Sequence, residues 1–150
     1  MRCGPAAQSR EERHGRVSQE TDRTVLHTDR APAAIGPYVQ ARTGSLQGRW
    51  IVTSGQVGID PPKGTLVPGG VAEQTEQAIR NLEAILAEGG ASLSDVVKTT
   101  VFLVDMADFR SMNEVYARHF VDPKPSRSTV AVRDLPLGAR VEIEVWAFHS

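Results

Sequence analysis

Apolar residues recur at helical spacing over residues 71–88, and this stretch predicts the clearest helix of the chain. Gly89 and Gly90 follow it, and glycine adopts the left-handed conformation that ends a helix without a Cβ penalty. A second helix is predicted to follow Asp105, because aspartate commonly caps helix N-termini. The residues expected to face inward are Val71, Thr75, Ala78, Ile79, Leu82, Ile85 and Leu86 in the first helix, and Met106, Phe109, Tyr116, Ala117 and Phe120 in the second.

Alternating apolar residues and β-branched residues predict six strands, over residues 24–27, 38–46, 49–57, 96–104, 128–132 and 140–148. Gln47 and Gly48 are typical of a hairpin turn between the second and third strands. Gly55 interrupts the third strand, which indicates a bulge or the close approach of another backbone. The order of elements predicts an α+β fold with both helices on one face of a sheet, and residues 96–104 as a central strand.

The last predicted strand has two different faces. One face carries Val141, Ile143, Val145 and Ala147, and the other carries Glu142, Glu144, Trp146 and Phe148. The face of the sheet without helices therefore holds large apolar side chains, which a soluble monomer does not leave exposed. We expect the protein to self-associate through this face.

The first 23 residues differ in composition from the rest of the chain. They contain five arginines and four acidic residues with almost nothing apolar beyond Val17, so they cannot bury enough surface to become ordered. The acidic residues argue against an organelle transit peptide. We therefore expect a disordered N-terminal tail over residues 1–23 and a single domain over residues 24–150.

Composition and charge narrow the class of protein. The 150 residues include 17 basic and 18 acidic side chains, and the net charge of −1 does not favour nucleic acid or an anionic membrane as a partner. Cys3 is the single cysteine, which excludes an intramolecular disulfide and suits a reducing cytosol. The four histidines are scattered without metal-ligand spacing, and no apolar run is long enough for a membrane span. These features predict a cytoplasmic, soluble protein without a metal site.

Two charged residues in the last two strands are candidates for chemistry. Arg127 stands at the start of one predicted strand, and a guanidinium matches a carboxylate in shape and charge, so it suits the capture of a small anion. Glu142 in the next strand is suited to handling a proton or a water, and Glu144 shares its face and is an alternative. An ion pair of Arg127 with Glu142 or Glu144 at a subunit interface is the purely structural interpretation of the same pattern.

Six ordered segments resemble the RidA/YjgF family of reactive-intermediate (imine) deaminases, and together they span the chain from about residue 24 to its end. They are residues 31–40 (APAAIGPYVQ), 53–56 (TSGQ), 96–102 (VVKTTVF), 113–116 (NEVY), 125–128 (PSRS) and 141–144 (VEIE). The resemblance implies a chorismate-mutase-like fold with a mixed six-stranded sheet, and a homotrimer with active sites between subunits. It also implies hydrolysis of 2-iminobutanoate and 2-iminopropanoate, the tautomer of 2-aminoacrylate, without a metal or cofactor. This activity protects pyridoxal-phosphate enzymes.

The resemblance also assigns roles to residues. Arg127 is expected to bind the substrate carboxylate and Glu142 to hold or activate the attacking water. The expected catalytic residues are Arg127, Glu142 and Tyr38, and the expected substrate-binding residues are Ser54, Gly55, Asn113, Ser128 and Thr129. Thr129 departs from the pattern, because several relatives have cysteine there. For two of these residues a structural role is an open alternative to a role in the pocket. Tyr38 is also explained by packing, and Asn113 is also explained by capping of backbone groups.

Two other classes of function are compatible with the sequence. A non-catalytic trimer that binds a 2-oxoacid or another small carboxylate, with a regulatory or chaperone-like role, would need Arg127 but not Glu142. Similar proteins have also been assigned ribonuclease and translation-inhibitor roles, but this chain has no cluster of basic and aromatic residues typical of RNA binding. The presence of both Arg127 and Glu142 favours catalysis.

Overall fold

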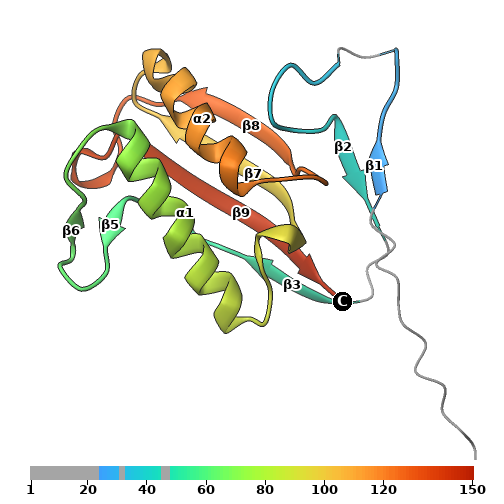
Figure 1. Ribbon diagram of the computed structural model, residues 1–150, viewed down its shortest axis with the longest axis horizontal. Helices are drawn as coiled ribbons and strands as arrows, with labels where there is room; N and C mark the ends of the chain where they lie inside the picture. Colours follow the sequence, from blue (N-terminus) through green and yellow to red (C-terminus); the bar gives the residue numbers. More distant parts are fainter. Residues whose placement is uncertain (1–23, 31–32, 45–47) are drawn as a thin grey trace, which may run out of the picture.

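A computed structural model describes residues 24–30, 33–44 and 48–150 of the chain (Figure 1). The predicted disordered tail, residues 1–23, lies outside the described residues, as does Gln47 of the predicted hairpin turn. In the described part, no helix has the length and apolar character needed to cross a membrane.

A mixed sheet of five strands forms the centre of the fold. Its strands run in the order β3–β9–β7–β8, and β4 also pairs with β9. β7 and β8 are parallel, and the other pairs are antiparallel. β7 is an interior strand, which confirms the prediction of a central strand there. The strand bounds are β3 (Arg49–Val52), β4 (Gln56–Val57), β7 (Val96–Leu103), β8 (Ser126–Ala131) and β9 (Val141–His149).

Both long helices cross the same face of this sheet, as predicted (Figure 1). They are α1 (Val71–Glu88) and α2 (Phe109–His119). α2 lies in the crossover that connects the parallel strands β7 and β8. The core fills the space between helices and sheet, and its fully enclosed side chains include Ile79, Leu82, Leu86, Val101, Leu103, Met112, Tyr116, Val141, Ile143 and Val145.

Helix α1 has the predicted bounds, Val71–Glu88. Gly90 has a φ of +78°, so it is the second glycine of the pair that takes the left-handed conformation, and its amide donates to the carbonyl of Ala87. Six of the seven predicted inward residues are buried. Ile85 is the exception and is 38% exposed, because it lies at the margin of the apolar stripe, beside an open pocket that Gln56 and Val57 of β4 also line.

Helix α2 differs from the predicted stripe. Asp105 caps a short 3₁₀ turn, Met106–Asp108, through a hydrogen bond from the amide of Ala107, and α2 begins only at Phe109. Of the residues predicted to face inward, Met106 lies in this turn and is exposed, and Ala117 is exposed at the margin of the buried stripe. Tyr116 and Phe120 are buried and Phe109 is partly buried, as predicted. The buried residues of α2 are Met112, Val115 and Tyr116, with Phe120 just beyond its end.

The N-terminal strands do not join the main sheet. β1 (Thr24–Leu26) and β2 (Ala41–Thr43) form a separate antiparallel pair, so the predicted six-stranded sheet and the hairpin between β2 and β3 are not found. The segment containing β2 lies beside the edge strand β8 instead, where the amide of Val39 donates to the carbonyl of Pro125. A strand pattern indicates that a segment will pair but does not select which open edge it joins. A further short hairpin, β5 (Ile59–Asp60) and β6 (Thr65–Leu66), precedes α1.

The helix-free face of the sheet is apolar and open, as the strand pattern predicts. Trp50 and Trp146 are each almost half exposed, and Val52 is 56% exposed. The ring of Trp50 packs edge-on against Trp146 and Phe148, with ring centres 6.4 and 5.0 Å apart. Side chains of this size gathered on one face favour contact with another protein surface.

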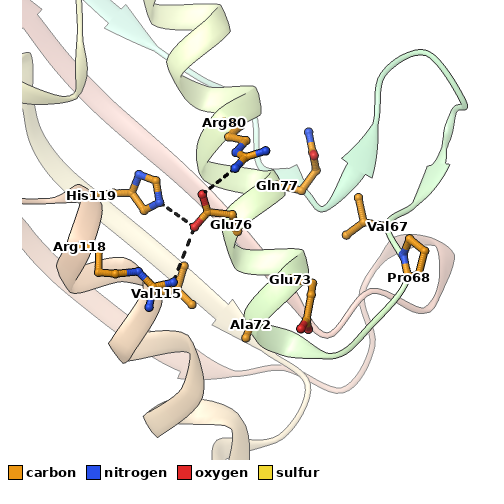
Figure 2. Close-up of a pocket in the computed structure, with 10 residues that line it drawn as sticks. All are labelled: Val67, Pro68, Ala72, Glu73, Glu76, Gln77, Arg80, Val115, Arg118 and His119. Carbon is orange, nitrogen blue, oxygen red and sulfur yellow. Dashed lines mark hydrogen bonds and ion pairs between the residues drawn. The ribbon is translucent and has the colours of Figure 1, made fainter.

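An ionic cluster on the outer surface joins α1 to α2 (Figure 2). The Glu76 carboxylate of α1 lies 2.8 Å from Nε2 of His119, 3.2 Å from Arg80 and 3.8 Å from Arg118. These side chains line a cavity of about 710 Å³ between the helices. The hydrogen bond from His119 lowers the pKa of the Glu76 carboxyl. The carboxylate is already matched by cationic partners, so its role here is to hold the two helices together.

Replacing this carboxylate should lower stability in a pH-dependent way. Glu76→Gln is expected to lower the Tm by about 2–4 °C at neutral pH. Because the folded state lowers the Glu76 pKa below its ordinary 4.5, its stabilisation is complete above that pH and is lost as pH falls through the lowered value. The difference between variant and wild type should therefore shrink in acid, as thermal unfolding at several pH values would measure. Glu114→Gln removes the exposed pair with Arg110 and is the matched control; an equal effect of both variants at every pH would contradict the assignment.

Candidate active site

Arg127 lies on the edge strand β8, on the side of the sheet that the helices cover. Its strand neighbour is Thr99 of β7, which is buried beneath α2. The Nη1 group of Arg127 donates a hydrogen bond of 2.7 Å to Oδ1 of Asn113. Asn113 belongs to α2, so this helix brings a polar side chain to the guanidinium.

Three aromatic rings surround the guanidinium. Its central carbon lies 4.8 Å from the ring centre of Tyr116, 5.4 Å from that of Tyr38 and 5.6 Å from that of Phe109. Tyr38 reaches the site from the N-terminal segment, and its hydroxyl accepts a hydrogen bond from the amide of Ile35. Aromatic faces attract a cation without neutralising it.

The charge of Arg127 has no counter-ion in the described part of the chain. No carboxylate of a described residue forms an ion pair with it, so Glu142 and Glu144 do not pair with it within one copy. Burial lowers the pKa of the guanidinium, and the nearby phenols of Tyr116 and Tyr38 oppose that effect. Arginine nevertheless stays protonated at neutral pH. A half-buried cation held by neutral groups is suited to binding an anion from outside the chain.

Glu142 lies on the opposite face of the sheet from Arg127. Its neighbours on β9, Val141 and Ile143, point into the core beneath the helices, so Glu142 points to the helix-free face. Glu144 shares that face and pairs with Thr100 of β7. The two predicted catalytic groups are therefore not brought together within one copy.

Gly55 lies directly against the Glu142 side chain. The predicted third strand is broken between β3 and β4, where Thr53 still exchanges two hydrogen bonds with Val145 through its amide and its hydroxyl oxygen. After this pair the chain passes over Glu142, and a Cβ on Gly55 would overlap the carboxylate. Ser54 beside it is exposed. Another group does approach Gly55 closely, but it is the Glu142 side chain and not the backbone that was predicted.

Adding a methyl group at Gly55 should displace the Glu142 carboxylate. Gly55→Ala is expected to lower any activity that depends on this carboxylate about tenfold, because a shift of about 1 Å in a reacting group is costly. Steady-state kinetics beside a melting curve would measure this. Gly70→Ala is the control, because the nearest atom to a Cβ there lies 3.8 Å away. Full activity of a folded Gly55→Ala protein would show that activity does not depend on the position of the Glu142 carboxylate beside Gly55.

The other two predicted binding residues of β8, Ser128 and Thr129, lie on opposite faces of the sheet. Ser128 points away from Arg127 and its hydroxyl accepts a hydrogen bond of 2.8 Å from Lys98 on the helix-free face. Thr129 is on the same side as Arg127, and its buried Oγ1 has no hydrogen-bond partner among the described residues. An unpaired buried hydroxyl beside the guanidinium is available to a ligand.

Phe109 and Tyr116 belong to the site, but the sequence pattern indicated only a core role for them. The sequence feature that indicates their place beside Asn113 is helical spacing, because positions 109, 113 and 116 fall on one face of α2. Tyr116 is fully enclosed, its hydroxyl lies 2.8 Å from that of Thr99, and burial raises its pKa to about 12. It is therefore neutral at physiological pH. The residues that the structure describes contain no group of acidic, histidine or cysteine side chains able to hold a metal ion.

Residues 28–149 match the model of a protein family described as Endoribonuclease L-PSP. A mouse protein named 2-iminobutanoate/2-iminopropanoate deaminase is 51% identical over 128 residues, which are 85% of this chain and 93% of the relative. The chain belongs to the RidA/YjgF family. The human protein of the same name is 48% identical over 128 residues, covering 85% of this chain and 91% of that protein. These matches confirm the family that the six segments indicated.

Solved structures of the family agree with the architecture. RidA from the Antarctic bacterium Psychrobacter superposes with a TM-score of 0.65 and 41% identity, covering 84% of this chain and 99% of that one. E. coli TdcF with bound serine gives a TM-score of 0.63 and 40% identity, covering 85% and 99%.

Proposed function

We propose that this protein hydrolyses 2-imino acids, such as 2-iminobutanoate and 2-iminopropanoate, to 2-oxoacids and ammonia. The observation that carries the proposal is the caged guanidinium of Arg127, which holds its charge without a counter-ion in the described chain. The deaminase names of relatives about 50% identical supply the reaction class. Removal of 2-aminoacrylate would protect pyridoxal-phosphate enzymes in the cytosol, a compartment that the single cysteine, Cys3, suits.

The chemistry needs few groups. The substrate carboxylate pairs with Arg127, and this anchoring makes attack by a bound water effectively unimolecular. Glu142 accepts a proton from the water as its oxygen bonds to the imine carbon. That proton then passes to the imine nitrogen, which gives a carbinolamine. The hydroxyl proton of the carbinolamine moves to its amine nitrogen, the C–N bond breaks as ammonia leaves, and the carbon–oxygen double bond of the 2-oxoacid forms. Thr129 is placed to hydrogen-bond a substrate oxygen or nitrogen through its unpaired hydroxyl.

Each site is proposed to combine Arg127 of one copy with Glu142 of another in a homotrimer. Two features support this arrangement: the two side chains occupy opposite faces of one sheet, and the helix-free face exposes Trp50 and Trp146. A contact that joins different patches of identical copies closes into a ring when its rotation allows, and a trimer is one such ring. The same contact would cover the exposed tryptophans.

Competition with semicarbazide tests the activity. An amino-acid oxidase generates the 2-imino acid, and semicarbazone formation is followed with wild type and Arg127→Ala. Wild type should suppress semicarbazone formation, and Arg127→Ala should not, because a substrate without its carboxylate anchor is not held for water attack. Wild type that leaves semicarbazone formation unchanged would refute the deaminase function.

A non-catalytic carboxylate-binding protein is the second candidate, because Arg127 with its neutral cage would serve a sensor equally well. The same assay separates the two functions when a titration with 2-oxobutanoate is added. Binding of the 2-oxoacid without suppression of semicarbazone formation would favour the binding protein and remove the role proposed for Glu142.

A further inference from the structure

We propose that Tyr116 and Phe109 are positioning residues that hold the Arg127 guanidinium in place to bind the carboxylate of its ligand. The inference rests on the carboxylate-binding role proposed for Arg127, and it adds the residues that orient the guanidinium for that role. We call the two rings the aromatic shelf.

The ring of Tyr116 is fixed on two sides. Its hydroxyl lies 2.8 Å from Oγ1 of Thr99, in the core. Phe120 stacks against it, with ring centres 4.3 Å apart and planes inclined by 26°. With Phe120 stacked on one face, the other face is left to the guanidinium of Arg127, whose carbon lies 4.8 Å from the ring centre. The shelf is therefore a rigid surface that belongs to the hydrophobic core.

Helix α2 supplies most of this support, and Tyr38 of the N-terminal segment adds a third ring. Phe109, Asn113 and Tyr116 lie on one face of α2, and all three contact Arg127. Asn113 provides the hydrogen bond that orients one Nη group, and the two rings provide attraction to the cation. A long arginine side chain otherwise loses considerable rotamer entropy when a ligand orders it, and preordering removes that cost from binding.

The neutral character of the shelf has a consequence for selectivity. A carboxylate in its place would hold the arginine as firmly but would neutralise it and compete with the ligand. Aromatic rings contact the flat face of the guanidinium, so the N–H groups at its edge stay available to a planar anion. The shelf should therefore affect recognition of the ligand's carboxylate much more than recognition of the rest of the ligand.

Titrations with 2-oxobutanoate and with its uncharged amide test the shelf directly. Tyr116→Leu is expected to weaken 2-oxobutanoate binding about tenfold while changing amide binding less than about twofold. Tyr116→Phe keeps the ring and should retain most of the carboxylate affinity, although its loss of the Thr99 hydrogen bond should lower the Tm. Phe109→Leu removes the second ring from a half-buried position and should weaken carboxylate binding about threefold.

Leu86→Ala is the control for damage to the core. It truncates a fully buried side chain of α1 that takes no part in the shelf, so it should lower the Tm while preserving the ratio of carboxylate to amide affinity. The shelf is refuted if folded Tyr116→Leu or Phe109→Leu binds 2-oxobutanoate as well as wild type, or if either loses both ligands equally. If Tyr116→Leu does not fold, Phe109→Leu decides the question. Failure of wild type in the semicarbazide assay would reject the deaminase but would leave this binding comparison valid.

Discussion

Mixing Arg127→Ala protein with Glu142→Gln protein should restore deaminase activity that neither variant has alone. The reason is the geometry of the sheet: Arg127 points to the helix side of β8 and Glu142 to the helix-free side of β9, so one copy cannot place both on one small substrate. In a mixed trimer, some sites join the Arg127 of one variant to the Glu142 of the other. With random assembly of equal amounts, about a quarter of all sites are intact.

Exchange of subunits has to be ensured, by co-expression or by refolding the mixture, and verified by native mass spectrometry of copies with different tags. The matched control is Arg127→Ala mixed with the double variant Arg127→Ala/Glu142→Gln. That mixture contains no Arg127 at all and should stay inactive. If verified mixed trimers show no activity above the separate variants, the shared site is wrong and another group acts in place of Glu142.

Asn113→Asp should raise KM for the imine about tenfold to a hundredfold. The new side chain has nearly the same shape as asparagine and would keep the 2.7 Å contact with Arg127, but it adds a negative charge there. A charge-assisted pair would then occupy the guanidinium, and the substrate carboxylate would have to displace it and face the repulsion of the introduced carboxylate. Measurement of KM and of the Kd for 2-oxobutanoate would both report the change.

Asn113→Ala distinguishes the effect of charge from the loss of a hydrogen bond. It frees the guanidinium without neutralising it, so KM should rise only about threefold to tenfold. Equal effects of the alanine and aspartate variants would mean that the charge balance around Arg127 does not control substrate binding.

Local rules account for the parts of the fold that were predicted correctly. The bounds of α1 follow from a stripe of apolar residues with two glycines after it, and the strands β7 and β9 follow from alternation with β-branched residues. The partition of β9 into a core face and an outer face also needs only the two-residue period of a strand. These features depend on neighbours a few residues apart, which the sequence contains directly.

The sequence-based predictions were wrong mainly where a strand can pair with more than one open sheet edge. β2 pairs with β1, and Val39 just before it forms an isolated bridge with Ser126 of β8, although the Gln47–Gly48 pair predicted a hairpin with β3. Met106 is exposed because it belongs to a 3₁₀ turn, Met106–Asp108, that precedes α2. Backbone hydrogen bonds are alike at every open edge, so pairing depends on contacts that no local pattern encodes.

The sequence by itself determined the candidate groups, namely Arg127 and Glu142, and the elements that carry them. Only the tertiary structure decided their surroundings. Tyr38 comes from a segment 89 residues before Arg127, whereas Phe109, Asn113 and Tyr116 come from α2, and their convergence depends on how α2 packs over β7 and β8. The opposite orientation of Arg127 and Glu142 likewise depends on strand register, because shifting a strand by one residue exchanges its two faces.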